Sequence, residues 1–212
     1  MDILEDESLL EEKELLTTIW TKPTLTFEFI FKYCPKKYVN YLLVIGGIVN
    51  AVDRNYQHFT ENGNFSIINF IAIIGLGGLF GWIFSKIYAS LLSWTGKWLN
   101  GKADGDQLTT VVAWATIPFI CSSVLLIPRL LMSGDNSFSY NIQEQGISKF
   151  VAFVLIALIQ LVLSCWSLVI IVKGIAVVQK FDTRKATLNA FLPLFVIVVP
   201  IILIAVIFNL IH

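Results

Sequence analysis

The feature that most constrains this chain is a long segment without a charged side chain. From residue 150 to residue 172 the sequence is apolar except for Gln160, Ser164 and Ser167. A helix needs about 20 mainly apolar residues to cross the hydrocarbon core of a bilayer, and this segment is long enough. A helix that is apolar on all sides suits lipid better than water, so we predict a transmembrane helix here.

Further segments of this kind predict an all-α, polytopic membrane helix bundle with about five transmembrane helices. The chain is 56% hydrophobic and only 14% charged, whereas a soluble domain carries about 25% charged residues. Prolines interrupt the third and fifth segments, which membrane helices tolerate because neighbouring groups bind the freed carbonyls. The predicted spans are 38–52, 67–92, 108–132, 150–172 and 186–211.

The residues before the first span predict a cytoplasmic region, 1–37, ahead of a transmembrane domain, 38–212. Apolar residues at helical spacing among acidic ones predict an amphipathic helix over 6–20, and its candidate partner-docking residues are Leu9, Leu16 and Trp20. Residues 23–32 alternate in a way typical of a strand. An isolated strand at a membrane edge would leave its backbone without hydrogen-bond partners, so we predict a short interfacial helix.

The basic residues are distributed unevenly between the two sides of the predicted bundle. One side carries only Arg54, Arg129 and Lys149, and the other side carries the rest of the 15 lysines and arginines. The positive-inside rule therefore predicts a cytoplasmic N-terminus and an external C-terminus. We expect no secretory signal peptide, because the N-terminal residues are acidic and no cleavage pattern follows them.

Residues that carry catalysis are nearly absent, so we predict that the protein is not an enzyme. The two histidines, His58 and His212, lie apart, and no metal, phosphate-binding or nucleophile motif occurs. The widely spaced cysteines predict neither a disulfide nor a metal site, and we expect no cofactor. A net charge of zero argues against a nucleic-acid partner. The cysteines are Cys34, Cys121 and Cys165.

For two acidic residues and four tryptophans we favour a structural role over a functional one. Asp104 and Asp106 can form a cation or catalytic pair, but a solvated turn is favoured, with Asp106 as a cap of the third span. The tryptophans near span ends are typical of an interfacial belt. They are Trp82, Trp94, Trp98 and Trp114.

Small and polar residues inside the spans are the remaining candidates. A glycine cluster in the second span predicts a close helix contact, either within the chain, which we favour, or in an oligomer. Lys86, Gln160 and Ser164 form a candidate polar path, although helix–helix hydrogen bonding explains the polar residues of the fourth span more simply. No Asp or Glu lies inside a predicted span, which argues against ion-coupled transport. The glycines are Gly75, Gly77, Gly78 and Gly81.

Three sequence stretches carry a resemblance to a known family. The first is 19–27 (IWTKPTLTF), with a lysine-proline pair before the first span. The second runs from 98–101 (WLNG) to 108–118 (LTTVVAWATIP), and the third from 166–170 (WSLVI) to 186–193 (ATLNAFLP). Taken together, they resemble the Yip1-domain family of small five-span membrane proteins, and the likeness extends from about Thr18 to the C-terminus.

The resemblance implies five helices with the N-terminus in the cytoplasm and the C-terminus external or lumenal. Eukaryotic members are associated with membrane traffic and small GTPases, and they carry a longer acidic-aromatic N-terminal stretch that is absent here. This chain looks like a bacterial member in the cytoplasmic (inner) membrane. We therefore expect a non-enzymatic scaffold or accessory subunit of a membrane complex or trafficking process. Its expected partners are membrane lipids and a second protein or further copies of itself. The alternatives are a transporter or channel for a small or lipid-like solute and, less favoured, an intramembrane enzyme.

Overall fold

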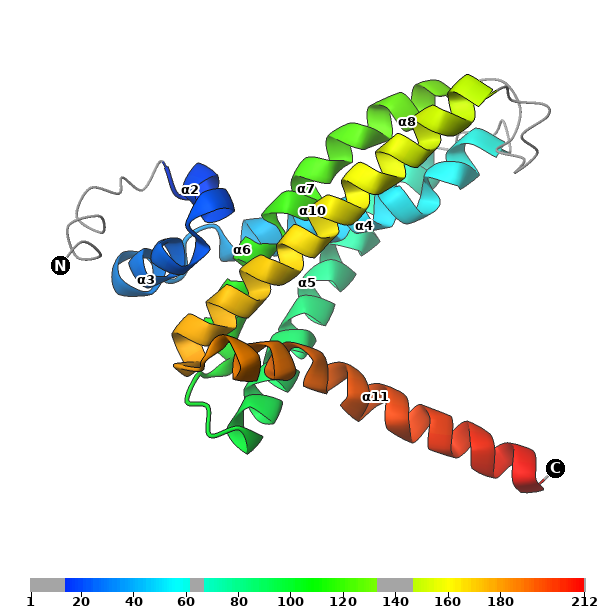
Figure 1. Ribbon diagram of the computed structural model, residues 1–212. Coiled ribbons are helices and arrows are strands. Elements are labelled where there is room, and N and C mark those ends of the chain that lie inside the picture. The colour runs from blue at the N-terminus through cyan, green and yellow to red at the C-terminus, as the bar shows by residue number, and fades with distance from the viewer. Residues whose placement is uncertain (1–13, 62–66, 133–146, 212) are drawn as a thin grey trace. The chain divides into compact units, whose positions relative to one another are not determined.

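The computed structural model describes residues 14–61, 67–132 and 147–211, and every regular element in these ranges is a helix. The predicted all-α fold is confirmed over them (Figure 1). The helices are α2 (Leu15–Thr21), α3 (Pro23–Tyr33), α4 (Val39–Glu61), α5 (Ile67–Trp98), α6 (Gly105–Ala115), α7 (Ile117–Ser122), the 3-10 helix η1 (Ser123–Leu125), α8 (Leu126–Met132), α10 (Ile147–Gln179) and α11 (Thr183–Ile211).

Four stretches among the described residues are long and apolar enough to cross a membrane, and they coincide with the second to fifth predicted spans. They are Ile67–Trp98, Gly105–Arg129, Ile147–Gln179 and Thr183–Asn209. The most apolar part of Gly105–Arg129 is 56% buried, against 6–11% in the other three. The third span is therefore the one that the protein itself covers, and the others expose most of their apolar surface.

The first predicted span, 38–52, corresponds to α4, which is longer and less apolar than expected. The prediction that this helix ends at residue 52 was wrong, because α4 continues through Asp53 and Arg54 to Glu61. Hydropathy changes at residue 52, but the backbone hydrogen bonding of a helix does not depend on the polarity of its side chains.

The prolines act differently in the third and fifth spans. Pro118 lies in the first turn of α7, after a break at Thr116, and Pro128 lies in the first turn of α8. The first turn tolerates proline because its N–H groups have no helical acceptor. Pro193 and Pro200, by contrast, lie inside the continuous helix α11.

Residues 23–32 are helical, as predicted, and form most of α3. Pro23 occupies the first turn, and the Thr26 hydroxyl donates to the Lys22 carbonyl over 2.9 Å. Phe27 and Ile30 are fully buried. The buried residues follow one face of a helix, so the alternation typical of a strand was coincidental.

Helices α5 and α10 both extend about two turns beyond the predicted spans and end in the same way. Asn100 and Lys180 follow them with φ values of 67° and 55°. The Gly101 N–H donates to the Gly96 carbonyl over 2.9 Å, and the Phe181 N–H donates to the Ala176 carbonyl over 3.0 Å. These are Schellman endings, which bind carbonyls that the helix itself leaves free.

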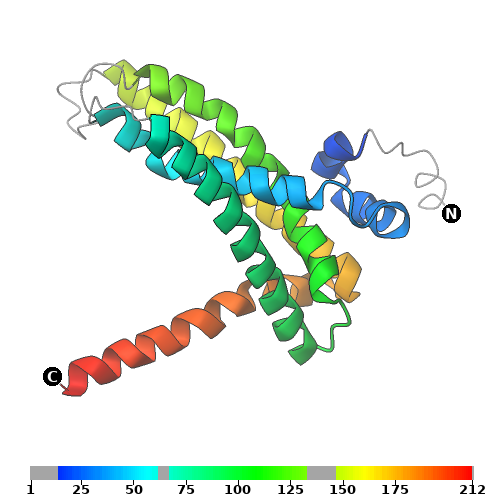
Figure 2. The same cartoon turned by 180° about the vertical axis from the view of Figure 1, so that it is seen from behind.

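The chain divides into two compact units, each assembled from separate segments. Unit 1 consists of Met1–Lys37, Lys86–Val112 and Ile170–His212. In it, α2 and α3 lie side by side (Figures 1 and 2), and they belong with parts of α5, α6 and α10 and with α11. The two-domain division at residue 37 stays a prediction. Fully buried apolar side chains of unit 1 are Leu15, Ile19, Phe27, Ile30, Ala89, Leu92, Leu108, Val111, Ile170, Ile175 and Ala186.

Unit 2 consists of Tyr38–Ser85 and Ala113–Val169, and α4 contacts both α7 and α8 within it. The Trp82 indole N–H donates to Asn40 Oδ1 over 3.0 Å, which joins α5 to α4. Trp114 is fully buried, and its ring centroid lies 6.2 Å from that of Tyr38. The prediction that Trp114 belongs to an interfacial belt was therefore wrong, because the residue packs inside its unit.

Candidate functional site

Helices α4 and α5 of unit 2 approach each other closely at a glycine seam. A Cβ added at Gly81 would overlap the backbone of Gly47, and one added at Gly77 would overlap the Ala51 side chain. The two backbones can approach this closely only because no side chains separate them. Gly78 faces Val44 at 3.1 Å, measured from the position of an added Cβ.

The four glycines that the sequence singled out are therefore not equivalent. Gly77, Gly78 and Gly81 face α4, whereas a Cβ added at Gly75 would meet nothing within 4 Å. The sequence showed a cluster of small residues on α5. It did not reveal Gly47, the glycine of α4 that completes the contact.

A groove of about 760 Å³ runs beside the glycine seam. On the α4 side its lining includes Asn50, Arg54 and Asn55, and on the α5 side it includes Leu76 and Phe80. The α4 side thus places two amides and a positive charge at one end of an otherwise mainly apolar groove, and the α5 side is apolar except for Ser85. Such an arrangement can hold a molecule that has both a polar and an apolar part.

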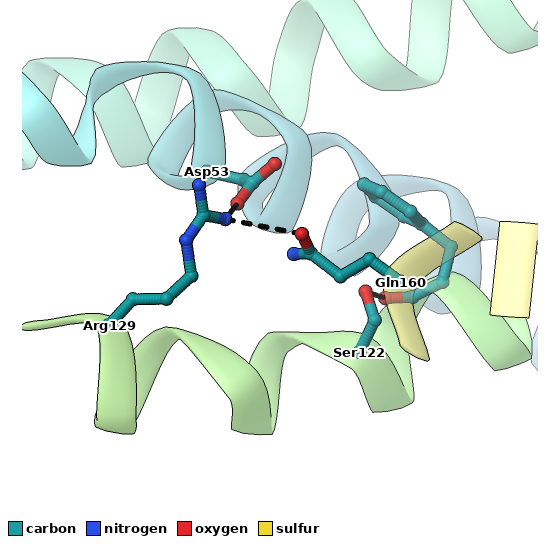
Figure 3. Close-up of polar contacts among 5 residues, drawn as sticks. Asp53, Ser122, Arg129 and Gln160 are labelled. Carbon is teal, nitrogen blue, oxygen red and sulfur yellow. Dashed lines mark hydrogen bonds and ion pairs between the residues drawn. The ribbon is translucent and has the colours of Figure 1, made fainter. Parts of the chain in front are cut away.

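A polar cluster joins three helices of unit 2 (Figure 3). Arg129 Nη1 on α8 lies 2.7 Å from Asp53 Oδ1 on α4 and 3.4 Å from Gln160 Oε1 on α10. The Arg129 side chain is 12% exposed and that of Asp53 is 32% exposed. The guanidinium therefore donates to two acceptors in a site that is partly withdrawn from solvent.

This cluster includes an acidic residue that the sequence placed just beyond the first span. No acidic residue was placed inside a span because the first span was ended at residue 52, yet Asp53 lies within α4. Gln160 and Arg129 were both noted, but separately. The signal that could have revealed the cluster was an acidic residue directly after an apolar run, together with an arginine of opposite charge next to Pro128.

The predicted polar path is not brought together as one site. Lys86 belongs to unit 1, whereas Gln160 and Ser164 belong to unit 2. Gln160 takes part in the Arg129 cluster, and Ser164 is exposed on α10. No arrangement of all three residues follows from the structure.

The predicted docking residues lie at the N-terminal end of the chain. Leu9 is outside the described residues. On α2, Leu15 and Ile19 are fully buried, whereas Leu16 is 44% exposed and Trp20 is half-buried. The face of α2 that packs inside unit 1 is thus the Leu15 face, and Leu16 points away from it.

Unit 1 contains a buried hydrogen-bond network that the sequence did not reveal. The Asn189 side-chain amide on α11 donates to the Leu92 carbonyl over 3.1 Å and to Thr95 Oγ1 over 2.9 Å. Gln179 at the end of α10 donates to Asn189 Oδ1 over 3.4 Å and accepts from the Ala103 N–H over 3.0 Å. The network joins α5, α10 and α11. The available signal was Asn189, a single amide in an otherwise apolar stretch of the fifth span.

The acidic pair before the third span has a structural role. The Gln107 N–H donates to Asp104 Oδ1 over 2.7 Å, and the Asp104 N–H donates to Gln107 Oε1 over 3.2 Å. This reciprocal pair is a capping box at the start of α6. The predicted cap was wrong by two residues, because Asp106 lies in the first turn rather than before it.

No group of three or more possible metal ligands gathers among the residues that the structure describes. Cys34 is half-buried, and Cys121 and Cys165 are exposed.

Comparison with known proteins now adds the family to this geometry. The family model for the Yip1 domain matches residues 18–204. The chain belongs to the Yip1-domain family. The match covers all three stretches that carried the resemblance, and it includes every element from the end of α2 to the exposed half of α11.

The Yip1 assignment gives the type of protein, a membrane protein built of apolar helices. No curated protein and no solved structure matches the chain.

Proposed function

We propose that this Yip1-domain protein is a non-enzymatic membrane scaffold or accessory subunit, which acts by holding another membrane polypeptide. The observation that carries this proposal is the second half of α11. Its described apolar side chains from Leu194 to Phe208 are largely exposed, including Ile201 at 60% and Phe208 at 62%. Within unit 1, this part of α11 extends away from the other helices (Figures 1 and 2).

The base of the same helix is fixed. Asn189 and Gln179 hold the first part of α11 against α5 and α10 through the buried network, and Ala186 is fully buried beside them. The Tyr88 hydroxyl adds a hydrogen bond to the Ala190 carbonyl over 3.0 Å. A helix held at one end and uncovered at the other presents a defined surface, and membrane helices associate through the packing of such surfaces.

The exposed Leu16 on α2 provides a second contact in this proposal, together with Leu9 and Trp20 as the predicted docking residues. The acidic residues that precede α2 make a protein partner a better match for this region than an anionic membrane surface, which would repel them.

We place the protein in the bacterial cytoplasmic membrane, with the N-terminus inside and the C-terminus outside. The segments of unit 1 contain all of the 15 basic residues except Arg54, Arg129 and Lys149. The helix ends and loops of unit 1 that carry these basic residues, which exclude the C-terminal end of α11, are thus the ones that the positive-inside rule assigns to the cytoplasm.

The test is purification in a mild detergent followed by native mass spectrometry. We expect a stoichiometric second polypeptide, either another membrane protein or a further copy of this chain. The variant Ile202→Trp changes the shape of the exposed α11 surface and should release it. Leu158→Trp on α10, at a residue of similar exposure, is the matched control and should retain it. A lone chain, or equal retention by both variants, would contradict the proposal.

Transport of a small solute is the second candidate, and the Arg129 cluster favours it. Charged residues within membrane helices often mark ion or substrate pathways, and the cluster lies where broken helices meet α4. The assay uses liposomes that contain the protein and an entrapped pH dye, with a proton or sodium gradient imposed across the membrane. We expect Gln160→Leu to reduce the flux of the parent protein, with Lys86→Met tested beside it. Absence of flux in the parent would eliminate proton-coupled transport and sodium–proton exchange.

A further inference from the structure

We propose that the groove between α4 and α5 binds an anionic phospholipid, with the phosphate at Arg54 and one acyl chain along the apolar wall of α5. This inference concerns unit 2 and is independent of the role proposed for α11 in unit 1. It rests on the charge, exposure and dimensions of the groove.

No residue that the structure describes neutralises the charge at one end of the groove. Arg54 is exposed, lines the groove and makes no ion pair with any residue that the structure describes. Its neighbour Asp53, the acidic residue nearest in sequence, is bound to Arg129 on a different face of α4. Adjacent helical residues point about 100° apart, so the cluster leaves the Arg54 guanidinium available for another anion.

The Asn50 side-chain amide provides a hydrogen-bond donor on the same face of α4 as the Arg54 guanidinium. Asn50 lies one turn before Arg54 on the same face of α4, is exposed and lines the groove. Residues four apart on a helix are neighbours, so the Asn50 amide and the guanidinium can bind one phosphate group together.

The opposite wall matches an acyl chain. Leu76, Phe80 and Phe84 line the groove at helical spacing on α5, with exposed fractions of 54%, 48% and 64%. From Leu43 to Asn55 the groove follows α4 over about 18 Å, at about 1.5 Å per residue. Three residues of the glycine seam, Gly47, Gly77 and Gly81, also line the groove and place no side chain in it.

The position of Arg54 along α4 also suits a lipid headgroup. Arg54 lies about 22 Å from Val39 along the helix axis, and the hydrocarbon core is about 30 Å thick. A long arginine side chain can extend from this depth towards the membrane boundary. A partner helix would instead bring apolar side chains against Asn50 and Arg54, and the buried guanidinium would lose its solvation.

The experiment compares lipids that differ only in charge. The full-length protein is delipidated in mild detergent and titrated with phosphatidylglycerol or phosphatidylcholine of identical acyl chains, and bound lipid is counted by native mass spectrometry. We expect one phosphatidylglycerol to bind with a preference of about fivefold or more, the contribution of one basic residue near anionic lipid. Arg54→Gln should abolish the preference. Lys149→Gln, which removes another basic residue of unit 2 outside the groove, should preserve it.

A second variant tests the apolar wall. Leu76→Trp fills the groove with a larger side chain and should weaken the binding of both lipids, while the exposed position lets the protein fold. No charge preference in the parent protein would overturn the inference. So would a preference that survives Arg54→Gln, or one that Lys149→Gln reduces equally, since that would indicate attraction to overall charge. A second copy of the chain that excludes lipid from the groove would also overturn it.

Discussion

The glycine seam leads to a sharp prediction, because one helix contains both a contact glycine and a matched control. In Gly81→Ala the new methyl group would overlap the Cα atom of Gly47 and lie 3.0 Å from its nitrogen. Non-bonded carbon atoms prefer a separation of 3.5–4.0 Å, so α4 and α5 must move apart by roughly 1–2 Å. In Gly75→Ala the methyl group meets no atom within 4 Å.

The expected energies differ in sign. Inserting a methyl group into a filled contact costs about 1–3 kcal/mol, and alanine recovers about 0.5–1 kcal/mol through its better helix propensity. We expect a net loss of about 1–2 kcal/mol for Gly81→Ala, which is a roughly 5- to 30-fold change in the folded-to-unfolded ratio. Gly75→Ala gains the propensity term alone, so it should be neutral or slightly more stable.

The assay is reversible unfolding by sodium dodecyl sulfate in mixed micelles, followed by tryptophan fluorescence. Trp82 reports locally, since it is on α5 and donates to Asn40 on α4. Equal unfolding midpoints for the two variants would refute the reasoning, as would a larger loss for Gly75→Ala.

Three further predictions use the same kind of comparison. Asp53→Asn and Arg129→Gln should each destabilise unit 2 by about 1–3 kcal/mol, which is less than the 3–5 kcal/mol of a fully buried pair because Asp53 is partly exposed. The double variant should lose less stability than the sum of the two single variants. Additive losses in the same unfolding assay would show that the pair is not coupled. Asp104→Ala should cost about 1 kcal/mol through loss of the α6 cap, and hydrogen exchange unchanged at the start of α6 would contradict it. With the native cysteines replaced, a membrane-impermeant maleimide should label Lys149→Cys in intact cells and Lys102→Cys only after lysis, and the reverse pattern would invert the topology.

Hydropathy was sufficient for the type of fold but not for the helix ends. Four predicted spans could be located because each long apolar stretch must form helix in lipid. The ends at 52, 92 and 172 were too early, because side-chain polarity and backbone helicity end at different places. The endings at Asn100 and Lys180 depend on left-handed backbone conformations, which the apolar pattern does not encode.

The contacts of the candidate site were predictable only in part, since they depend on which residues of different helices lie opposite each other. The α5 glycines were visible as a cluster, but their partner Gly47 is on another helix. Gln160 and Arg129 were both apparent, and their link to Asp53 needed the true extent of α4. Asn189 was not predicted as a site either, because its partners Leu92 and Thr95 lie on another helix.

The central claim, that α11 holds another polypeptide, is tested most directly by a photo-crosslinking scan in living cells. A photoreactive amino acid is placed in turn at the exposed residues of α11 from Leu194 to Phe208, with the fully buried Ile170 as the internal control. We predict protein adducts that recur every three to four residues, since a partner covers one face of a helix. Crosslinks to lipid alone at every position, or protein adducts without this periodicity, would contradict the claim.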